Sequence, residues 1–205
     1  MRESEGQDEH LSALWLTTLQ QLADRAAHDV RNTLNGVAVN VEVVRSRAVR
    51  GGDVSTIAPF ATAAATQVEI LSGQADALVA ILRPTSAPVD IGALLGRLVT
   101  LMRGEDGNSE IALDLPVNSG AVASGAGGNA TRLALSAALM AALDRGGRVA
   151  CRLGTEGAPT VYISSGSGGP LTLDHDIAAT VTNAGILLAP SPDGIVVTFP
   201  SSLRD

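Results

Sequence analysis

The sequence predicts an α+β protein in which a long N-terminal helical hairpin precedes an α/β sandwich. Through most of the first 82 residues, apolar side chains recur every three or four positions, which is typical of amphipathic helices. Beyond Pro88, short helical and strand-like segments alternate, as they do in an α/β sandwich. The chain has 205 residues, of which 45% are hydrophobic, so it can bury a full core and is not mainly a disordered tail.

The hairpin is expected from two long helices that follow a polar tail over residues 1–10. The first helix should cover residues 11–50, because a pair of glycines follows it at Gly51 and Gly52. The second should cover residues 55–82, because prolines follow it closely. Together they form an expected helical domain over residues 11–84.

Both helices carry an apolar stripe that is more than one hairpin can bury. The stripe residues are Leu19, Leu22, Ala26, Val30, Leu34, Val37, Val41 and Val44 in the first helix, and Phe60, Ala64, Val68, Leu71, Ala75, Leu78 and Leu82 in the second. Their near-heptad spacing is that of a helical bundle. We therefore expect a homodimer in which two hairpins form a four-helix bundle, with Leu71 and Leu78 pointing inward.

The second expected domain, residues 88–205, contains the α/β sandwich. Asp90 is a candidate N-cap for its first helix. Helices are expected over residues 91–103, 131–143 and 174–184, and strands over 111–115, 148–153, 160–164, 186–189 and 195–199. A glycine-rich loop covers residues 120–128, and Asp193-Gly194 is a good turn between the last two strands.

Composition narrows the classes of partner. The formal charge is −7, and Lys and Arg do not cluster beyond Arg45, Arg47 and Arg50, so a nucleic-acid-binding surface is poorly supported. No apolar run approaches the roughly 20 residues needed to span a bilayer, and the first residues are acidic and polar. We expect a cytoplasmic protein that binds neither nucleic acid nor membrane.

Metal and thiol chemistry are also poorly supported. Cys151 is the only cysteine, and it lies in an alternating segment where a small buried strand residue is expected. His10, His28 and His175 lie far apart, without the i, i+4 spacing of a helical ligand pair. We expect this chain to bind no metal or cofactor.

His28 is the most informative residue of the first helix. At roughly 100° per residue it projects about 180° from the centre of the apolar stripe, so its ring should face solvent. Asp24, Asn32 and Asn35 flank it on the same polar face. An imidazole in water is largely unprotonated at neutral pH and can act as a nucleophile. A lone surface histidine is more often merely solvated, so its neighbours decide between the two interpretations.

Those neighbours resemble the H-box of two-component histidine kinases and of the related dimeric histidine phosphotransferases of bacterial phosphorelays. That motif runs His-acid-x-x-(Asn/Ser/Thr) before small and apolar residues, and His28-Asp29-Val30-Arg31-Asn32-Thr33-Leu34 matches it position by position. Residues 88–95 are similar to the entry into the kinase ATP-binding domain, and residues 129–133 to the start of one of its helices. The resemblance covers most of the chain and implies a phosphoacceptor hairpin followed by a kinase-like domain.

Three departures from the kinase pattern indicate that this second domain is degenerate. Kinases carry an asparagine that coordinates Mg²⁺ in the helix corresponding to residues 134–143, which here contain none. Their Asp-x-Gly-x-Gly motif appears as Ser164-Ser165-Gly166-Ser167-Gly168, with serine in place of the carboxylate. Residues 169–174 leave no room for the lid that covers the triphosphate. The glycine-rich turn still offers N–H groups to an anion, although its composition is that of any flexible turn.

The resemblance therefore implies a phosphotransferase that does not bind ATP. His28 would attack an aspartyl phosphate on a response-regulator receiver domain, which would itself hold the required Mg²⁺. Asp29 would accept a hydrogen bond from the other ring nitrogen, and Asn32 would position the phosphoryl group or a water molecule.

Two valines suggest where the receiver docks. Val39 and Val43 fall on the His28 side of the first helix, roughly three and four turns toward its C-terminus. We expect them to form the apolar centre of a docking patch, although scattered surface valines are also common. The rim of this patch would consist of Asn35, Glu42 and Arg45.

Two other functions remain open from the sequence. The chain could be an ATP-dependent histidine kinase with an eroded nucleotide site, which a nucleotide-binding assay would reveal. It could also be a non-catalytic dimeric scaffold, in which His28 would be inert to phosphate donors.

Overall fold

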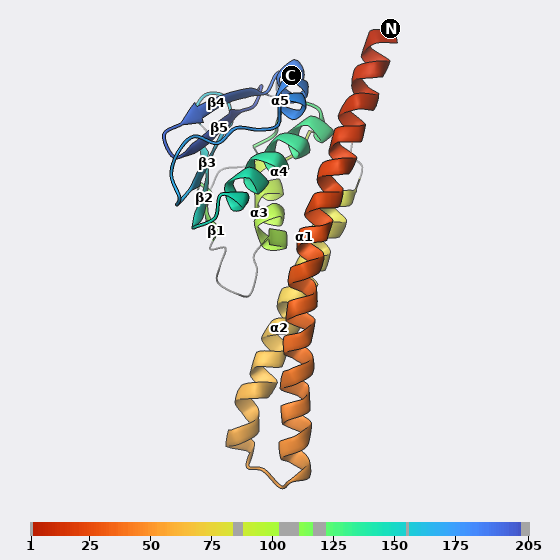
Figure 1. Ribbon diagram of the computed structural model, residues 1–205, viewed down its shortest axis with the longest axis vertical. Helices are drawn as coiled ribbons and strands as arrows, with labels where there is room; N and C mark the ends of the chain where they lie inside the picture. The colour runs from red at the N-terminus through yellow and green to blue at the C-terminus, as the bar shows by residue number, and fades with distance from the viewer. Residues whose placement is uncertain (1, 84–87, 103–110, 117–121, 155, 202–205) are drawn as a thin grey trace.

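The computed structural model describes residues 2–83, 88–102, 111–116, 122–154 and 156–201. Two long helices form an antiparallel hairpin, and a five-stranded sheet with its helices lies beside one end of the hairpin (Figure 1). The predicted α+β class and order of parts are thus confirmed. Residues 84–87, at the expected domain boundary, and residues 120–121 of the expected glycine-rich loop lie outside the described residues. Within the described part, no helix combines the length and apolar character of a membrane span.

The first helix, α1 (Arg2–Val49), is longer than the sequence predicts. Residues 2–10 were expected as a polar tail, but they form the first turns of the helix. They contain no proline and are rich in helix-favouring Glu, Gln and Arg, and the apolar residues that follow them, Leu11, Leu14 and Trp15, pack against the core. The C-terminal end is as expected, because Gly51 adopts a φ of +73° just beyond it.

The connection to α2 (Val54–Leu82) is held by local contacts. The Asp53 carboxylate accepts the Ser55 N–H at 3.2 Å and so caps the helix. Arg47 donates to the Thr56 carbonyl at 2.6 Å and lies over the Phe60 ring, 4.6 Å from its centroid. These contacts fix the tight reversal at the far end of the hairpin.

Polar residues pack inside the hairpin as well as apolar ones. Asn40 donates to the Gln67 side chain at 3.1 Å across the two helices. A Cβ at Gly36 would overlap only the flexible end of the Gln67 side chain, so its amide would have to shift. The hydrogen bond between Asn40 and Gln67 links α1 to α2 inside the hairpin.

The sheet consists of β1 (Ile111–Asp114), β2 (Val149–Gly154), β3 (Thr160–Ser165), β4 (Leu187–Ser191) and β5 (Gly194–Thr198). Its strand order is β1-β2-β3-β5-β4, with β1 parallel to β2 and the other pairs antiparallel. Val149, Cys151 and Leu153 of β2 are buried while Ala150 and Arg152 are exposed, so one face of the sheet packs on helices and the other is open.

Three helices cover the packed face of the sheet: α3 (Ile91–Met102), α4 (Gly128–Asp144) and α5 (His175–Asn183). The expected cap of α3 is confirmed, since the Asp90 carboxylate accepts the Ala93 N–H at 3.1 Å. Figure 1 shows α4 lying between the sheet and α1, and every residue from Ala130 to Leu139 is accordingly buried.

One hydrophobic core joins the hairpin to the α/β layer. Leu22 and Ala26 of α1, together with Ala77 and Ile81 of α2, belong to the same cluster as the residues beneath the sheet. The end of the hairpin near the N-terminal half of α1 is therefore anchored, whereas its far end projects away from the sheet (Figure 1). His28 lies on α1 just beyond this shared core.

Candidate functional site

His28 projects into solvent from α1, with 70% of its side chain exposed. Its Nδ1 lies 3.3 Å from the Asn32 amide nitrogen and 3.5 Å from an Asp29 carboxylate oxygen. None of the described residues forms a hydrogen bond with Nε2. The arrangement leaves one ring nitrogen held by its neighbours and the other open to an incoming group.

The two neighbours favour opposite tautomers of the ring. A carboxylate can only accept, so Asp29 favours a proton on Nδ1, which leaves the lone pair on Nε2 free. The Asn32 amide nitrogen can only donate, so in this orientation it favours a bare Nδ1 and a protonated Nε2. Asp29 is therefore the neighbour that prepares Nε2 as a nucleophile.

The next residue of the motif anchors the helix. Thr33 is buried, and its hydroxyl donates to the Asp29 carbonyl at 3.0 Å. His28 is exposed, Asp29 and Asn32 are half-buried, and Thr33 lies inside. The motif thus passes from solvent to core within about one and a half turns.

An ion pair beside His28 was not predicted from the sequence. Arg25 lies three residues before His28, and its Nη1 donates to the Asp144 carboxylate at 2.7 Å. Asp144 is the last residue of α4, so the pair links α1 to the α/β layer. The spacing of Arg25 from His28 is visible in the sequence, but nothing there indicates a partner 119 positions away.

The expected docking residues lie along α1 beyond His28. Val39 is 64% exposed and Asn35 is exposed, whereas Val43 is half-buried and contributes less surface. Glu42 and Arg45 form an exposed pair with contacts of 2.7 and 2.8 Å, and the hydrogen bond from Arg45 lowers the pKa of Glu42. The surface therefore presents one exposed apolar side chain with a polar rim.

The glycine-rich turn after β3 uses its N–H groups internally. Gly166 donates to the Arg148 carbonyl at 2.7 Å and Gly168 to the Ser165 carbonyl at 2.9 Å. Arg145 donates to the Gly168 and Pro170 carbonyls at 3.2 and 2.8 Å, which ties the turn to the end of α4. The anion cradle that the glycines alone would permit is therefore filled by the chain's own contacts.

A hollow of about 390 Å³ lies between α1, α4 and the start of α5. Ala137, Met140 and Ala141 line its α4 side. Asp144 and Asp174 also line it, and Arg25 is already paired with the first of these carboxylates. The hollow is therefore lined by two carboxylates and one guanidinium that is already paired.

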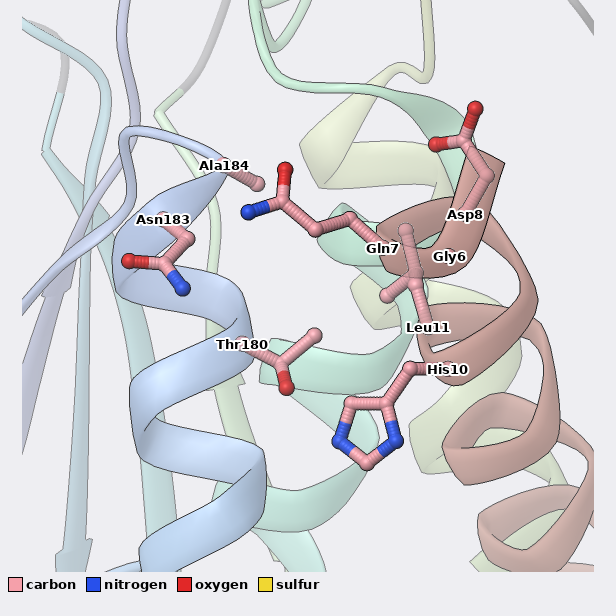
Figure 2. Close-up of a pocket in the computed structure, with 8 residues that line it drawn as sticks. All are labelled: Gly6, Gln7, Asp8, His10, Leu11, Thr180, Asn183 and Ala184. Carbon is pink, nitrogen blue, oxygen red and sulfur yellow. The ribbon is translucent and has the colours of Figure 1, made fainter. Parts of the chain in front are cut away.

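A second hollow, of about 560 Å³, lies between the first turns of α1 and the end of α5. Figure 2 shows Gln7 and His10 pointing from α1 toward Thr180 and Asn183 across this space. His10 precedes His28 by eighteen residues, or roughly 27 Å along a helix. The two histidines therefore belong to separate surfaces.

The remaining candidate side chains show no reactive arrangement. Cys151 is buried, and burial raises the pKa of its thiol to about 12. In the part of the chain that the structure describes, no three His, Cys, Asp or Glu side chains gather in a way that could hold a metal ion.

No protein-family model matches this sequence, and the search of curated proteins also found no match. Among solved structures, a bacterial phosphotransferase matches with a TM-score of 0.50 and 17% identity, covering 93% of this chain and 95% of that one. At this identity the match shows a shared fold, and it extends over nearly the whole of both chains.

Two histidine kinases also match, with lower TM-scores. The Acinetobacter baumannii kinase AdeS matches at 0.42 and 15% identity, covering 87% of this chain and 98% of that one. The blue-light activated kinase EL346 of Erythrobacter litoralis matches at 0.36 and 16% identity, covering 90% of this chain and 60% of that one.

Proposed function

We propose that this chain is a histidine phosphotransferase that exchanges phosphoryl groups between His28 and the aspartates of response-regulator receiver domains, without binding ATP. The observation that carries the proposal is the exposed His28 ring, whose Nδ1 lies beside Asp29 while Nε2 is open to solvent. The shared fold with a bacterial phosphotransferase adds support, because it extends over nearly the whole chain. Two-component signalling is the process in which such an exchange operates.

The exchange uses one ring nitrogen as nucleophile and the other as proton holder. The Nε2 lone pair attacks the phosphorus of the aspartyl phosphate, and a P–N bond forms as the P–O bond breaks. The electron pair of that bond returns to the receiver carboxylate. The proton stays on Nδ1, and the Asp29 carboxylate, 3.5 Å from that nitrogen, offsets the positive charge that the ring gains. The reverse step passes the group to another receiver, and Mg²⁺ is expected on the receiver.

The direct test is labelling by a phosphorylated receiver domain. His28→Ala should abolish transfer while leaving the fold unchanged, because an exposed ring contributes little packing. His10→Ala is the matched control, since His10 is also exposed on α1, and it should be labelled like the wild-type protein. Labelling of the His28→Ala variant would refute the proposal, and a wild-type protein inert to every phosphodonor would favour a scaffold.

The absence of ATP binding is supported by three local features. No asparagine lies in α4 between Ala134 and Leu143, the N–H groups of the glycine-rich turn are used internally, and two carboxylates line the neighbouring hollow. Calorimetry with Mg-ATP should therefore show no saturable heat at micromolar concentrations. Micromolar binding accompanied by autophosphorylation would instead identify an ATP-dependent kinase.

We infer that the receiver docks on the α1 surface formed by Asn35, Val39, Glu42 and Val43. Val39 supplies its apolar centre, because it is 64% exposed on the His28 side of the helix. Val39→Asp should slow transfer about tenfold or more by placing a charge in the apolar contact. Val49→Asp, at an exposed valine near the end of α1, is the matched control and should transfer normally. Equal rates for both variants would place the docking surface elsewhere.

A further inference from the structure

Arg25 lies one helical turn before His28 and uses only part of its hydrogen-bonding capacity. Its Nη1 donates to Asp144, and none of the other described residues accepts a hydrogen bond from its remaining N–H groups. A guanidinium has five N–H donors, so most of the Arg25 fork remains available. Residues three apart on a helix have Cβ atoms roughly 5–6 Å apart, which places a group on the His28 ring within reach of this side chain.

A phosphoryl group on His28 would compete with Asp144 for this guanidinium. A phosphoryl group carries roughly two negative charges and three acceptor oxygens, against the single charge of a carboxylate. The planar fork of arginine matches the oxygens of a phosphoryl group and can donate to two of them at once.

We propose that Arg25 is a phosphoryl-binding residue, shared between Asp144 and the phosphoryl group on His28. The proposal rests on the proposed function, because it requires that His28 be phosphorylated. Binding of Arg25 to the phosphoryl group stabilises phospho-His28 and the transfer transition state. It also withdraws Arg25 from Asp144, and so links the phosphorylation of α1 to the contact between α1 and α4.

The alternative is that the ion pair only holds α1 and α4 together. The two roles predict different effects of substituting Arg25 and Asp144 on the rate of phosphoryl transfer. If the pair is only a link, Arg25→Gln and Asp144→Asn break the same contact and change the transfer rate by the same factor. If Arg25 binds the phosphoryl group, Arg25→Gln removes the ligand, whereas Asp144→Asn removes the competitor and frees Arg25.

The test uses the full chain labelled at His28 with phosphoramidate, a small-molecule phosphodonor that needs no receiver. The half-life of phospho-His28 and its rate of transfer to a receiver domain are then measured. Arg25→Gln should lower the transfer rate about tenfold, the loss of one charge-assisted hydrogen bond. Asp144→Asn should raise it, and Arg50→Gln, at an exposed arginine just beyond the end of α1 and far from His28, should change it less than twofold.

A charge swap completes the experiment. The double variant Arg25→Asp with Asp144→Arg can rebuild the ion pair but places a carboxylate beside His28, so its transfer should stay slow. Recovery of wild-type transfer in the swap, or equal losses in Arg25→Gln and Asp144→Asn, would overturn the role of Arg25.

The inference and the proposed function fail in different ways. If phosphoramidate labels His28 but no receiver exchanges with it, the proposed function fails. The inference is still tested, because Arg25→Gln should shorten the half-life of phospho-His28 and Asp144→Asn should lengthen it. If phosphoramidate labels other histidines but not His28, both are overturned.

Discussion

At the scale of single residues, the site depends on which ring nitrogen of His28 keeps its proton. Asp29 and Asn32 both lie near Nδ1, and they favour opposite tautomers. In the proposed mechanism the Asp29 carboxylate favours the proton on Nδ1 and so leaves Nε2 as the nucleophile. The proposed chemistry therefore depends on the charge of Asp29, not only on its size.

Asp29→Asn tests this dependence. The substitution keeps the shape but removes the charge that stabilises the ring cation, so phosphoryl transfer should slow by about 10²-fold. The measurement is the rate of label transfer from a phosphorylated receiver at fixed pH. Asp24→Asn, which changes an exposed carboxylate one turn before His28, should leave the rate within about twofold of wild type. Equal rates for the two variants would show that Asp29 does not act on the ring.

The Cys151 thiol should be inert in the folded protein. Its pKa is raised from 9.0 to about 12 by burial, so the reactive thiolate is roughly 10³-fold scarcer than in a free thiol. A disulfide reagent at pH 8 should label the native protein slowly and the denatured protein at once. Rapid labelling under native conditions would show that β2 opens readily, because burial alone protects this side chain.

Residue positions that depend on local spacing could be predicted from the sequence. The exposure of His28 follows from its angle to the apolar stripe, and the capping role of Asp90 follows from its place before a helix. The partner of Arg25 could not be predicted, because Asp144 is brought near only when α4 packs against α1. Internal use of the N–H groups in the glycine-rich turn likewise depends on Arg148, which lies just before β2.

At the scale of elements, the predicted helices and strands all form, and their ends differ by a few residues. The exception is the start of α1. There the polar residues 2–10 extend the helix whose following apolar residues pack against the core. The turn between β4 and β5 is displaced by one residue from the predicted Asp193-Gly194, since Gly194 already pairs with Ser191 as the first residue of β5. Strand pairing, which the sequence does not specify, sets that boundary.

Gly194 should be one of the least replaceable positions of the sheet. A Cβ there would overlap the Ile163 carbonyl oxygen on the neighbouring β3, so the strands would have to separate. Gly194→Ala should lower the free energy of unfolding by about 1–3 kcal/mol. Denaturant titration followed by circular dichroism gives the value.

Gly96→Ala is the control for this substitution. Gly96 lies within α3, and a Cβ there would meet nothing within 4 Å. Alanine has less conformational freedom in the unfolded chain, so this variant should be more stable by about 0.5–1 kcal/mol. A loss of stability equal to that of Gly194→Ala would exclude the backbone contact as the cause.

At the scale of the whole molecule, the hairpin retains an uncovered apolar face. The α/β layer anchors only one end of it (Figure 1). Large apolar side chains stay exposed on both helices. They include Leu34 and Val41 on α1, and Val68, Val79 and Leu82 on α2. Leu71 and Leu78, which the sequence places inside a dimeric bundle, are already half-buried in the single chain. The exposed set is therefore the better indicator of where a second copy would pack.

We propose that two hairpins associate through this face, and Leu34 and Val68 provide the test. Each is about half exposed, at 51% and 52%, so a charge at either position should leave the single hairpin folded. In a four-helix bundle the same charge would be buried without a partner, and Leu34→Glu or Val68→Glu should shift the protein from dimer to monomer. Sedimentation equilibrium at about 10 μM, a typical working concentration well above a submicromolar dissociation constant, gives the mass.

Val39→Glu is the matched control, because Val39 is 64% exposed on α1 but lies about 140° around the helix from Leu34. It should remain dimeric while losing receiver transfer, so the same helix would carry dimerisation and phosphotransfer on separate faces. A dimer that survives both Leu34→Glu and Val68→Glu would show that the copies meet elsewhere, and a monomeric wild-type protein would show that this apolar face is covered by something other than a second hairpin.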